Sequence, residues 1–282
     1  MKVKITADST CDLPRSLIEQ YDIAITPLTV TLGEDSYLDG VDLDPNSIYP
    51  FVEATGTLPK TSAVNIAEYE RVFRTWTEQG YEVIHISLCS EFSSSCQNAM
   101  LAAQQVGHTT VVDSRNLSSG QGLIVLRAAE MAQSGADAQT VLDECQSMVS
   151  RVETSFVIDT LDYLYKGGRC SALAAFGANL LRIKPCIAVN EGKMLPEKKY
   201  RGQIEKVIAA YIEDRLKDRE DIDLSRVILT HTNCSESCVE RTREQILQLL
   251  PGIGELIVTV AGSTITTHCG PQSLGVLFVR KG

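Results

Sequence analysis

Residues 81–106 read YEVIHISLCSEFSSSCQNAMLAAQQV, and this stretch decides the fold that the sequence predicts. Residues 81–87 are rich in aromatic and β-branched types, which is typical of a strand. Residues 94–106 resemble a helix, and a run of serines joins the two segments. A parallel strand that feeds a helix brings the helix N-terminus to the carboxyl edge of its sheet, where open α/β sheets bind ligands. Hydroxyls and free N–H groups at that edge suit an anion such as a carboxylate or a phosphate.

The serine run also has a simpler interpretation. Ser93 or Ser94 is well suited to be only the N-cap of the helix that follows. The spacing of the hydroxyls leaves both interpretations open.

Strand-like and helix-like segments alternate through the first half of the chain. Strands are expected at 2–7, 25–32, 81–87 and 109–112. Helices are expected at 14–21, 45–55, 65–79, 94–106, 118–134 and 138–152. This βαβ rhythm predicts a parallel sheet with flanking helices.

The second half of the chain changes character. Strands are expected at 186–190, 194–200, 226–230, 255–260 and 274–279, and helices at 203–217 and 236–250. The first two strands are joined by a short turn and predict an antiparallel hairpin. We therefore predict an α/β protein with two domains, 1–153 and 154–282, the second with a mixed or antiparallel sheet.

Composition argues against several classes of function. The chain of 282 residues has a formal net charge of −10, which disfavours general binding to nucleic acids or membrane surfaces. No apolar run approaches the roughly 18 residues of a membrane-spanning helix, and the first residues lack the apolar segment of a secretory signal. The nine cysteines include no CxxC pair, so reduced thiols in the cytoplasm are expected.

Common catalytic and cofactor motifs are absent. The sequence contains no GxxxxGK[ST] phosphate loop, no GxGxxG, no GxSxG and no HExxH. His231, Cys234 and Cys238 are weak zinc candidates because they lack CxxC spacing and a second ligand pair, so we expect neither metal nor cofactor. His268 is expected on a sharp turn ahead of a strand, and His85 is expected to be structural.

Positive charge gathers in one part of this acidic chain. Between Tyr163 and Gln203 only two acids accompany eight basic residues, which are Lys166, Arg169, Arg182, Lys184, Lys193, Lys198, Lys199 and Arg201. This basic island is either an ordinary solvated hairpin or a docking face for an acidic partner or a phosphorylated group.

Seven motifs stand in the order of a known family. They are ADSTCDL (7–13), LPKTSAVN (58–65), SLCSEFSSSCQNA (87–99), VVDSRNLSSGQGLIV (111–125), LDYLYKGGRC (161–170), RIKPCIAV (182–189) and HCGPQSLGV (268–276). Together they resemble the DegV family of bacterial fatty-acid-binding proteins, over essentially the whole chain. The resemblance implies a two-domain α/β protein that holds one fatty acid in a tunnel between its domains. It also implies that the carboxylate is presented to a separate ATP-dependent fatty-acid kinase, which forms an acyl phosphate.

The resemblance implies roles for individual residues. The positions that match the carboxylate site are Thr61, Ser62, Ser93, the backbone N–H of Ser94, and His268. Those that match positions tied to the kinase interaction are Arg169 and Arg201.

This chain departs from the family pattern at two places near the expected carboxylate. Ser93-Ser94-Ser95 stands where the family usually has Ser-Gly-Thr. Gln272 stands where the HxGPG motif has its second glycine.

Two other functions remain open alongside a fatty-acid carrier. A free-standing serine hydrolase or small-molecule phosphotransferase would use Ser93 and His268, and a hydrolase would also need an acid to orient the histidine. A regulatory module would keep the lipid only as a structural filler.

Overall fold

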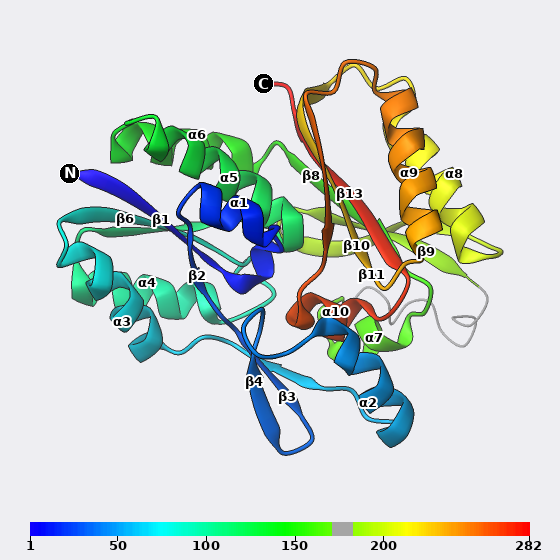
Figure 1. Ribbon diagram of the computed structural model, residues 1–282, viewed down its shortest axis with the longest axis horizontal. Coiled ribbons are helices and arrows are strands. Elements are labelled where there is room, and N and C mark those ends of the chain that lie inside the picture. Colours follow the sequence, from blue (N-terminus) through cyan, green and yellow to red (C-terminus); the bar gives the residue numbers. More distant parts are fainter. Residues whose placement is uncertain (171–182) are drawn as a thin grey trace. The chain divides into compact units, whose positions relative to one another are not determined.

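The computed structural model describes residues 1–170 and 183–282, which form two units (Figure 1). Unit 1 comprises Met1–Leu43 and Lys60–Arg151, and unit 2 comprises Asp44–Pro59 and Val152–Gly282. The predicted boundary at residue 153 lies beside the crossing from Arg151 to Val152. The sequence does not predict that Asp44–Pro59 packs with unit 2, because the residues before and after this segment both belong to unit 1.

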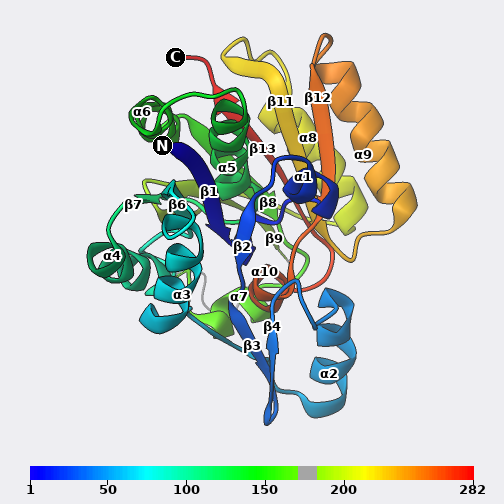
Figure 2. The ribbon, with the colours of Figure 1, turned by 60° about the vertical axis from the view of Figure 1, so that its left-hand side comes forward.

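A four-stranded parallel sheet forms the centre of unit 1, as predicted. Its order is β2 (Ala24–Thr26), β1 (Lys2–Asp8), β6 (Tyr81–Ser87) and β7 (Thr109–Asp113). Helices α3 (Ile66–Thr77) and α4 (Ser95–Val106) lie on one face, and α5 (Ser118–Gln133) and α6 (Ala138–Val149) lie on the other (Figures 1 and 2). Because helices cover both faces, β6 is buried from Val83 to its end at Ser87.

Smaller elements complete unit 1. They are the 3-10 turn η1 (Ser9–Cys11), the helix α1 (Arg15–Gln20) and an antiparallel sheet in the order β4 (Asp35–Leu38), β3 (Thr29–Leu32) and β5 (Lys60–Ser62).

The strand order of the parallel sheet reverses between β1 and β6. From β1 the chain first adds β2 on one side and later adds β6 and β7 on the other. Ligands of such sheets bind outside the carboxyl ends of the strands at this point. Asp8 ends β1 and Ser87 ends β6, and the serine run, Ser93 to Ser95, follows after a loop formed by residues 88–92.

Unit 2 is built on a six-stranded mixed sheet. Its order is β10 (Lys193–Tyr200), β9 (Lys184–Asn190), β8 (Val152–Val157), β13 (Ser273–Arg280), β11 (Ile222–Thr232) and β12 (Glu255–Val260). The β11–β12 pair is parallel and the other described pairs are antiparallel, including the predicted hairpin of β9 and β10. Helices α8 (Ile204–Leu216) and α9 (Glu236–Leu249) cover the sheet over an apolar core that contains Tyr211, Val227 and Phe278.

Two short helices and a 3-10 turn of unit 2 contact one further short helix. Helix α10 (Ser263–Cys269) contacts α7 (Asp162–Gly167), α2 (Ile48–Thr55) and the 3-10 turn η2 (Pro45–Ser47). His268 therefore lies inside a helix, and the sharp turn predicted for it begins only at Gly270, which has a φ of 72°.

The helix predicted at 138–152 ends earlier, at Val149, because β8 begins at Val152. Within residues 1–170 and 183–282, no helix combines the length and the apolar character needed to cross a membrane.

Candidate ligand-binding site

The serine run lies where the loop after β6 enters α4. Ser93 Oγ accepts a hydrogen bond from the backbone N–H of Ser95 at 3.1 Å and lies 3.0 Å from Ser95 Oγ. Ser93 is half-buried, whereas Ser94 is exposed and its side chain makes no capping bond. Ser93 therefore satisfies an N–H at the start of α4, as the N-cap interpretation expected, and its hydroxyl remains partly accessible.

Thr61 and Ser62 lie in β5, and Val64, just after β5, is hydrogen-bonded to the first turn of α4. Val64 N donates to Ser95 Oγ at 3.3 Å, and Asn98 Nδ2 donates to Val64 O at 2.7 Å. Thr61 is half-buried and Ser62 is exposed. Unit 1 thus brings together the two segments that carry its predicted ligand residues.

The neighbouring strand fixes the loop that precedes Ser93. Ser90 Oγ donates to Asp113 Oδ2 at 2.6 Å, and Asp113 is the last residue of β7. Cys89 N donates to Asn116 O at 3.0 Å. The loop is therefore held at two successive residues before it reaches the serine run.

His268, in unit 2, is a neutral imidazole. Burial and the positive charge of Arg169 lower the pKa of His268 to about 4. A neutral imidazole has one N–H donor and one acceptor nitrogen, so at pH 7 His268 is able to donate one hydrogen bond to a carboxylate.

Two glycines allow α7 and α10 to approach each other closely. A Cβ on Gly167, the last residue of α7, would overlap His268 Nδ1. A Cβ on Gly270 would lie 2.7 Å from Tyr163 Cδ2. The missing side chain at Gly167 therefore leaves room for the imidazole of His268, and the missing side chain at Gly270 leaves room for the ring of Tyr163.

Sequence reasoning missed Tyr49, which α2 places beside α10. Burial raises the pKa of Tyr49, whose hydroxyl lies near Thr232 and Thr266. Nothing in the local pattern of residues 45–55 distinguishes this tyrosine from an ordinary residue of an amphipathic helix. Its packing follows from the unpredicted assignment of Asp44–Pro59 to unit 2.

The two arginines predicted for docking are both exposed, but they differ in their surroundings. Arg169 Nη1 donates to Gly167 O at 2.9 Å, and its charge acts on His268. Arg201 follows β10 and precedes α8. Arg169 is thus coupled to the predicted head-group histidine as well as being available at the surface.

Acids from outside the basic island balance part of its charge. Lys184 pairs with Asp159 at 2.5 Å, and Lys198 pairs with Asp214 at 2.5 Å. Arg182 lies outside the described residues. The free positive charge of the described part is therefore smaller than the sequence count implies.

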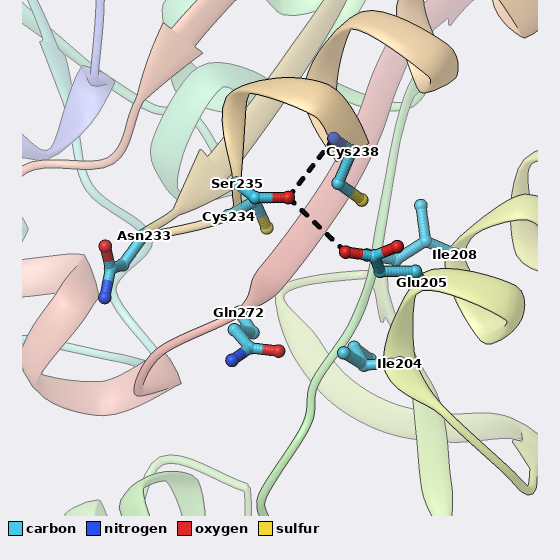
Figure 3. Close-up of a pocket in the computed structure, with 8 residues that line it drawn as sticks. All are labelled: Ile204, Glu205, Ile208, Asn233, Cys234, Ser235, Cys238 and Gln272. Atoms are coloured by element: carbon cyan, nitrogen blue, oxygen red, sulfur yellow. Dashed lines mark hydrogen bonds between the residues drawn. The ribbon is translucent and has the colours of Figure 1, made fainter.

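Unit 2 also contains a pocket of about 300 Å³ beside the start of α9 (Figure 3). Its lining residues are Ile204, Glu205, Ile208, Asn233, Cys234, Ser235, Cys238 and Gln272. Ser235 Oγ accepts from Cys238 N at 3.3 Å and donates to the carboxylate of Glu205 at 3.4 Å. A lining carboxylate disfavours a second carboxylate, so this pocket is a poor place for a fatty-acid head group.

The weak zinc candidates lie partly in the same pocket. Across the described ranges, no group of three or more His, Cys, Asp and Glu side chains is placed to hold a metal ion.

Known proteins resemble this chain along nearly its whole length. A family model described as "Uncharacterised protein, DegV family" matches residues 2–281. A DegV domain-containing protein of Caldanaerobacter subterraneus is 34% identical, with 99% of each chain covered. A Thermotoga maritima protein named as a fatty acid-binding protein is 33% identical over 98% of this chain and 96% of its own.

A solved structure shows the same likeness in three dimensions. It is that of a DegV family protein from Thermus thermophilus, described by its fatty acid binding, and it has a TM-score of 0.90 at 29% identity. It covers 99% of this chain and 100% of that one.

Proposed function

This chain belongs to the DegV family, and from that premise we propose that it binds one long-chain fatty acid. The head group is held by Thr61, Ser93 and His268, with Ser62 and the N–H of Ser94 as further donors. The main support is the Thermotoga maritima relative, which is named as a fatty acid-binding protein and matches 98% of this chain.

The chemistry of the candidate residues supports this proposal. A carboxylate taken out of water needs several hydrogen-bond donors. The candidate donors are the hydroxyls of Thr61 and Ser93 and the neutral imidazole of His268. Such donors bond the carboxylate oxygens without locking them in a bidentate ion pair, which suits a group that reacts later.

The expected affinity follows from the acyl chain. Burial of about 15 methylenes at ~0.8 kcal/mol each gives roughly 12 kcal/mol before costs. Lost translational and conformational freedom reduces this value, so we expect submicromolar binding.

The bound carboxylate is presented to a separate ATP-dependent kinase. A carboxylate oxygen attacks the γ-phosphorus of ATP, ADP leaves, and an acyl phosphate forms. Arg169 and Arg201 contribute to docking, and Arg169 also places positive charge near His268, where the product gains negative charge. We place this role in the cytoplasm, since the nine cysteines carry thiols, which fits a reducing compartment.

A serine hydrolase has less support. In a catalytic triad a carboxylate orients the histidine, whereas the charged neighbour that acts on His268 is the cation of Arg169. Ser93 Oγ accepts a hydrogen bond from the start of its own helix rather than standing on a nucleophile elbow.

Mass spectrometry of the purified protein tests the proposal. Denaturation is expected to release about one long-chain fatty acid per chain, and added isotope-labelled fatty acid is expected to exchange into the site. A protein that is empty and hydrolyses acyl esters favours the hydrolase. A bound lipid that does not exchange favours a regulatory module with a structural lipid.

A further inference from the structure

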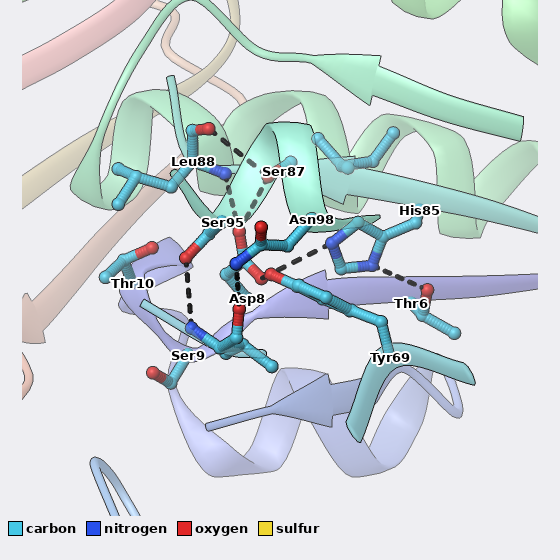
Figure 4. A network of polar contacts seen from close by, with 12 residues as sticks. Thr6, Asp8, Ser9, Thr10, Tyr69, His85, Ser87, Leu88, Ser95 and Asn98 are labelled. Atoms are coloured by element: carbon cyan, nitrogen blue, oxygen red, sulfur yellow. Dashed lines mark hydrogen bonds and ion pairs between the residues drawn. The ribbon is translucent and has the colours of Figure 1, made fainter. Parts of the chain in front are cut away.

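The first turn of α4 holds the main chain of Val64 through both of its polar groups. Asn98 Nδ2 donates to Val64 O at 2.7 Å, and Ser95 Oγ accepts from Val64 N at 3.3 Å. A carbonyl oxygen only accepts hydrogen bonds, so the nitrogen of the Asn98 amide must be the atom that faces it. Ser95 is 0% exposed and Val64 is 5% exposed, so water has little access to this pair of bonds, which we call the Val64 clasp (Figure 4).

The Val64 clasp lies next to both segments that carry candidate ligand residues. Val64 follows β5 by two positions, and β5 carries Thr61 and Ser62. On the other side, Ser95 N donates to Ser93 Oγ at 3.1 Å. Ser95 Oγ, which accepts from Val64 N, still has its proton to give to Ser93 Oγ at 3.0 Å, so the proton of Ser93 remains for a ligand.

A buried carboxylate anchors the loop that leads into α4 (Figure 4). Asp8 Oδ2 accepts from Ser87 Oγ at 2.9 Å and from Leu88 N at 2.7 Å. Asp8 Oδ1 accepts from Tyr69 OH at 2.5 Å and lies 3.3 Å from His85 Nε2. The side chains of Asp8, Tyr69, His85 and Ser87 are 0% exposed, so water does not replace these bonds. The first residue of the loop is therefore tied to the interior of the parallel sheet.

The anchored loop in turn holds the main chain of Ser93. Cys89 N donates to Asn116 O at 3.0 Å, and Cys89 O accepts from Ser93 N at 3.3 Å. Thr61, by contrast, lies in the three-stranded sheet, and among the described strands no ladder joins that sheet to the parallel one. The distance between Thr61 and Ser93 therefore depends on contacts outside the sheets, and the Val64 clasp is such a contact.

We propose that Asn98 is a positioning residue for the head-group site: it holds Val64 on the first turn of α4 and thereby sets the distance between Thr61 and Ser93. This inference rests on the proposed fatty-acid function. Hydrogen-bond donors in a binding site must keep their spacing to within about 0.5 Å, which requires neighbours that hold them in place. Asn98 supplies such a hold without being one of the proposed donors.

The test compares palmitate with cetyl alcohol, which has the same number of carbons but no carboxylate. Asn98→Ala removes the amide and leaves a good helix former at this position. We expect palmitate affinity to fall about three- to ten-fold, the factor that a neutral hydrogen bond contributes, while cetyl alcohol affinity stays nearly unchanged. In a Thr61→Ala background the further effect of Asn98→Ala is expected to disappear, because Asn98 acts through Thr61. Full additivity of the two substitutions would overturn this path.

A matched control comes from unit 2. Gln245 is half-buried, as Asn98 is, and its Nε2 donates to a main-chain carbonyl, Ala209 O, at 2.8 Å. Gln245→Ala is expected to lower thermal stability without changing the ratio of the two affinities. If Asn98→Ala gave the same pattern as this control, Asn98 would be merely structural and the proposal would be overturned.

A second variant covers a failure of Asn98→Ala to fold. Asn98→Asp keeps the size of the side chain but replaces the donor that faces Val64 O by an oxygen, and it is expected to lower the palmitate-to-alcohol affinity ratio in the same way. If the folded variants keep the wild-type ratio, the positioning role is overturned and the proposed function stands. If the wild-type chain binds neither ligand, the proposed function itself is overturned.

Discussion

Replacement of Gly167 by alanine tests the place of His268 with one added methyl group. The three atoms nearest to a Cβ at this position all belong to the imidazole of His268: Nδ1, which it overlaps, and Cε1 and Cγ at 3.3 and 3.5 Å. The backbone at Gly167 is not among the positive-φ positions, so alanine fits the local conformation. The imidazole must therefore move, and with it the hydrogen bond that we propose it donates to the carboxylate.

The expected loss is large for binding and small for stability. A lost hydrogen bond to a charged group costs roughly 1.5–3 kcal/mol, which weakens fatty-acid affinity about ten- to a hundred-fold. The forced contact costs about 1–3 kcal/mol of stability. Alanine regains up to about 1 kcal/mol because it is a better helix former than glycine.

Gly168 provides the matched control. It has a φ of +70°, and nothing lies within 4 Å of an added Cβ. Gly168→Ala is therefore expected to lose about 1 kcal/mol of stability through backbone strain while keeping its affinity. Fatty-acid titration and thermal unfolding of both variants measure the two effects separately. Wild-type affinity in a folded Gly167→Ala protein would refute the placement of His268 at the head group.

Other substitutions test the remaining roles. Ser93→Ala and Thr61→Ala are each expected to weaken fatty-acid binding by about ten- to a hundred-fold in titrations, and wild-type affinity in both would remove the carboxylate from these hydroxyls. Arg201→Ala is expected to keep fatty-acid affinity but to reduce acyl-phosphate formation by a DegV-type kinase; loss of both would assign Arg201 to the ligand site, and loss of neither would make the basic island an ordinary solvated surface. Arg169→Gln is expected to raise the pKa of His268 above about 4, although burial, the larger cause, keeps it below 6.5; NMR titration of the imidazole measures this, and an unchanged pKa would contradict the coupling. The pKa of His268 is lowered in the folded state, so between about pH 4 and 6.5 the unfolded chain binds a proton more readily than the folded chain does. The contribution of His268 to the free energy of unfolding is therefore fully present above about pH 6.5 and is lost as the pH falls toward about 4.

Local pattern was enough to predict most of the sheet strands. The predicted strands 81–87 and 255–260 agree with β6 and β12 at both ends, because each is a β-branched run bounded by turn residues. The serine run was located for the same reason, since it lies between a clear strand and a clear helix. Here sequence periodicity and tertiary structure favour the same conformation.

Helix α10 was missed because its residues are poor helix formers. Its sequence, STITTHC, contains four β-branched residues, which favour strands and turns. Two of its threonines bond back to the chain, Thr266 Oγ1 to Ala261 O at 3.2 Å and Thr267 Oγ1 to Ser263 O at 2.8 Å. Contacts with α7 and α2 stabilise this helix where local propensity does not.

The network around Asp8 was missed for a different reason. Tyr69 donates to a carboxylate 61 positions earlier in the chain, and no periodic pattern links two such positions. His85 was expected to be structural, but its position beside Asp8 is visible only once β1 and β6 lie side by side.

The segment Asp44–Pro59 has a consequence for the order in which the chain folds. This segment is synthesised early, whereas α10, which contacts α2 and η2, begins only at Ser263. Ile48 in α2 is fully buried in the finished protein and is therefore synthesised long before this part of its surroundings. Contacts between such distant segments form slowly and leave apolar surface open to aggregation in the meantime. Unit 1 is likewise interrupted and resumes only at Lys60. We therefore expect that a nascent chain stopped near residue 151 exposes Ile48 and recruits chaperones, and that synthesis of the final strands releases them.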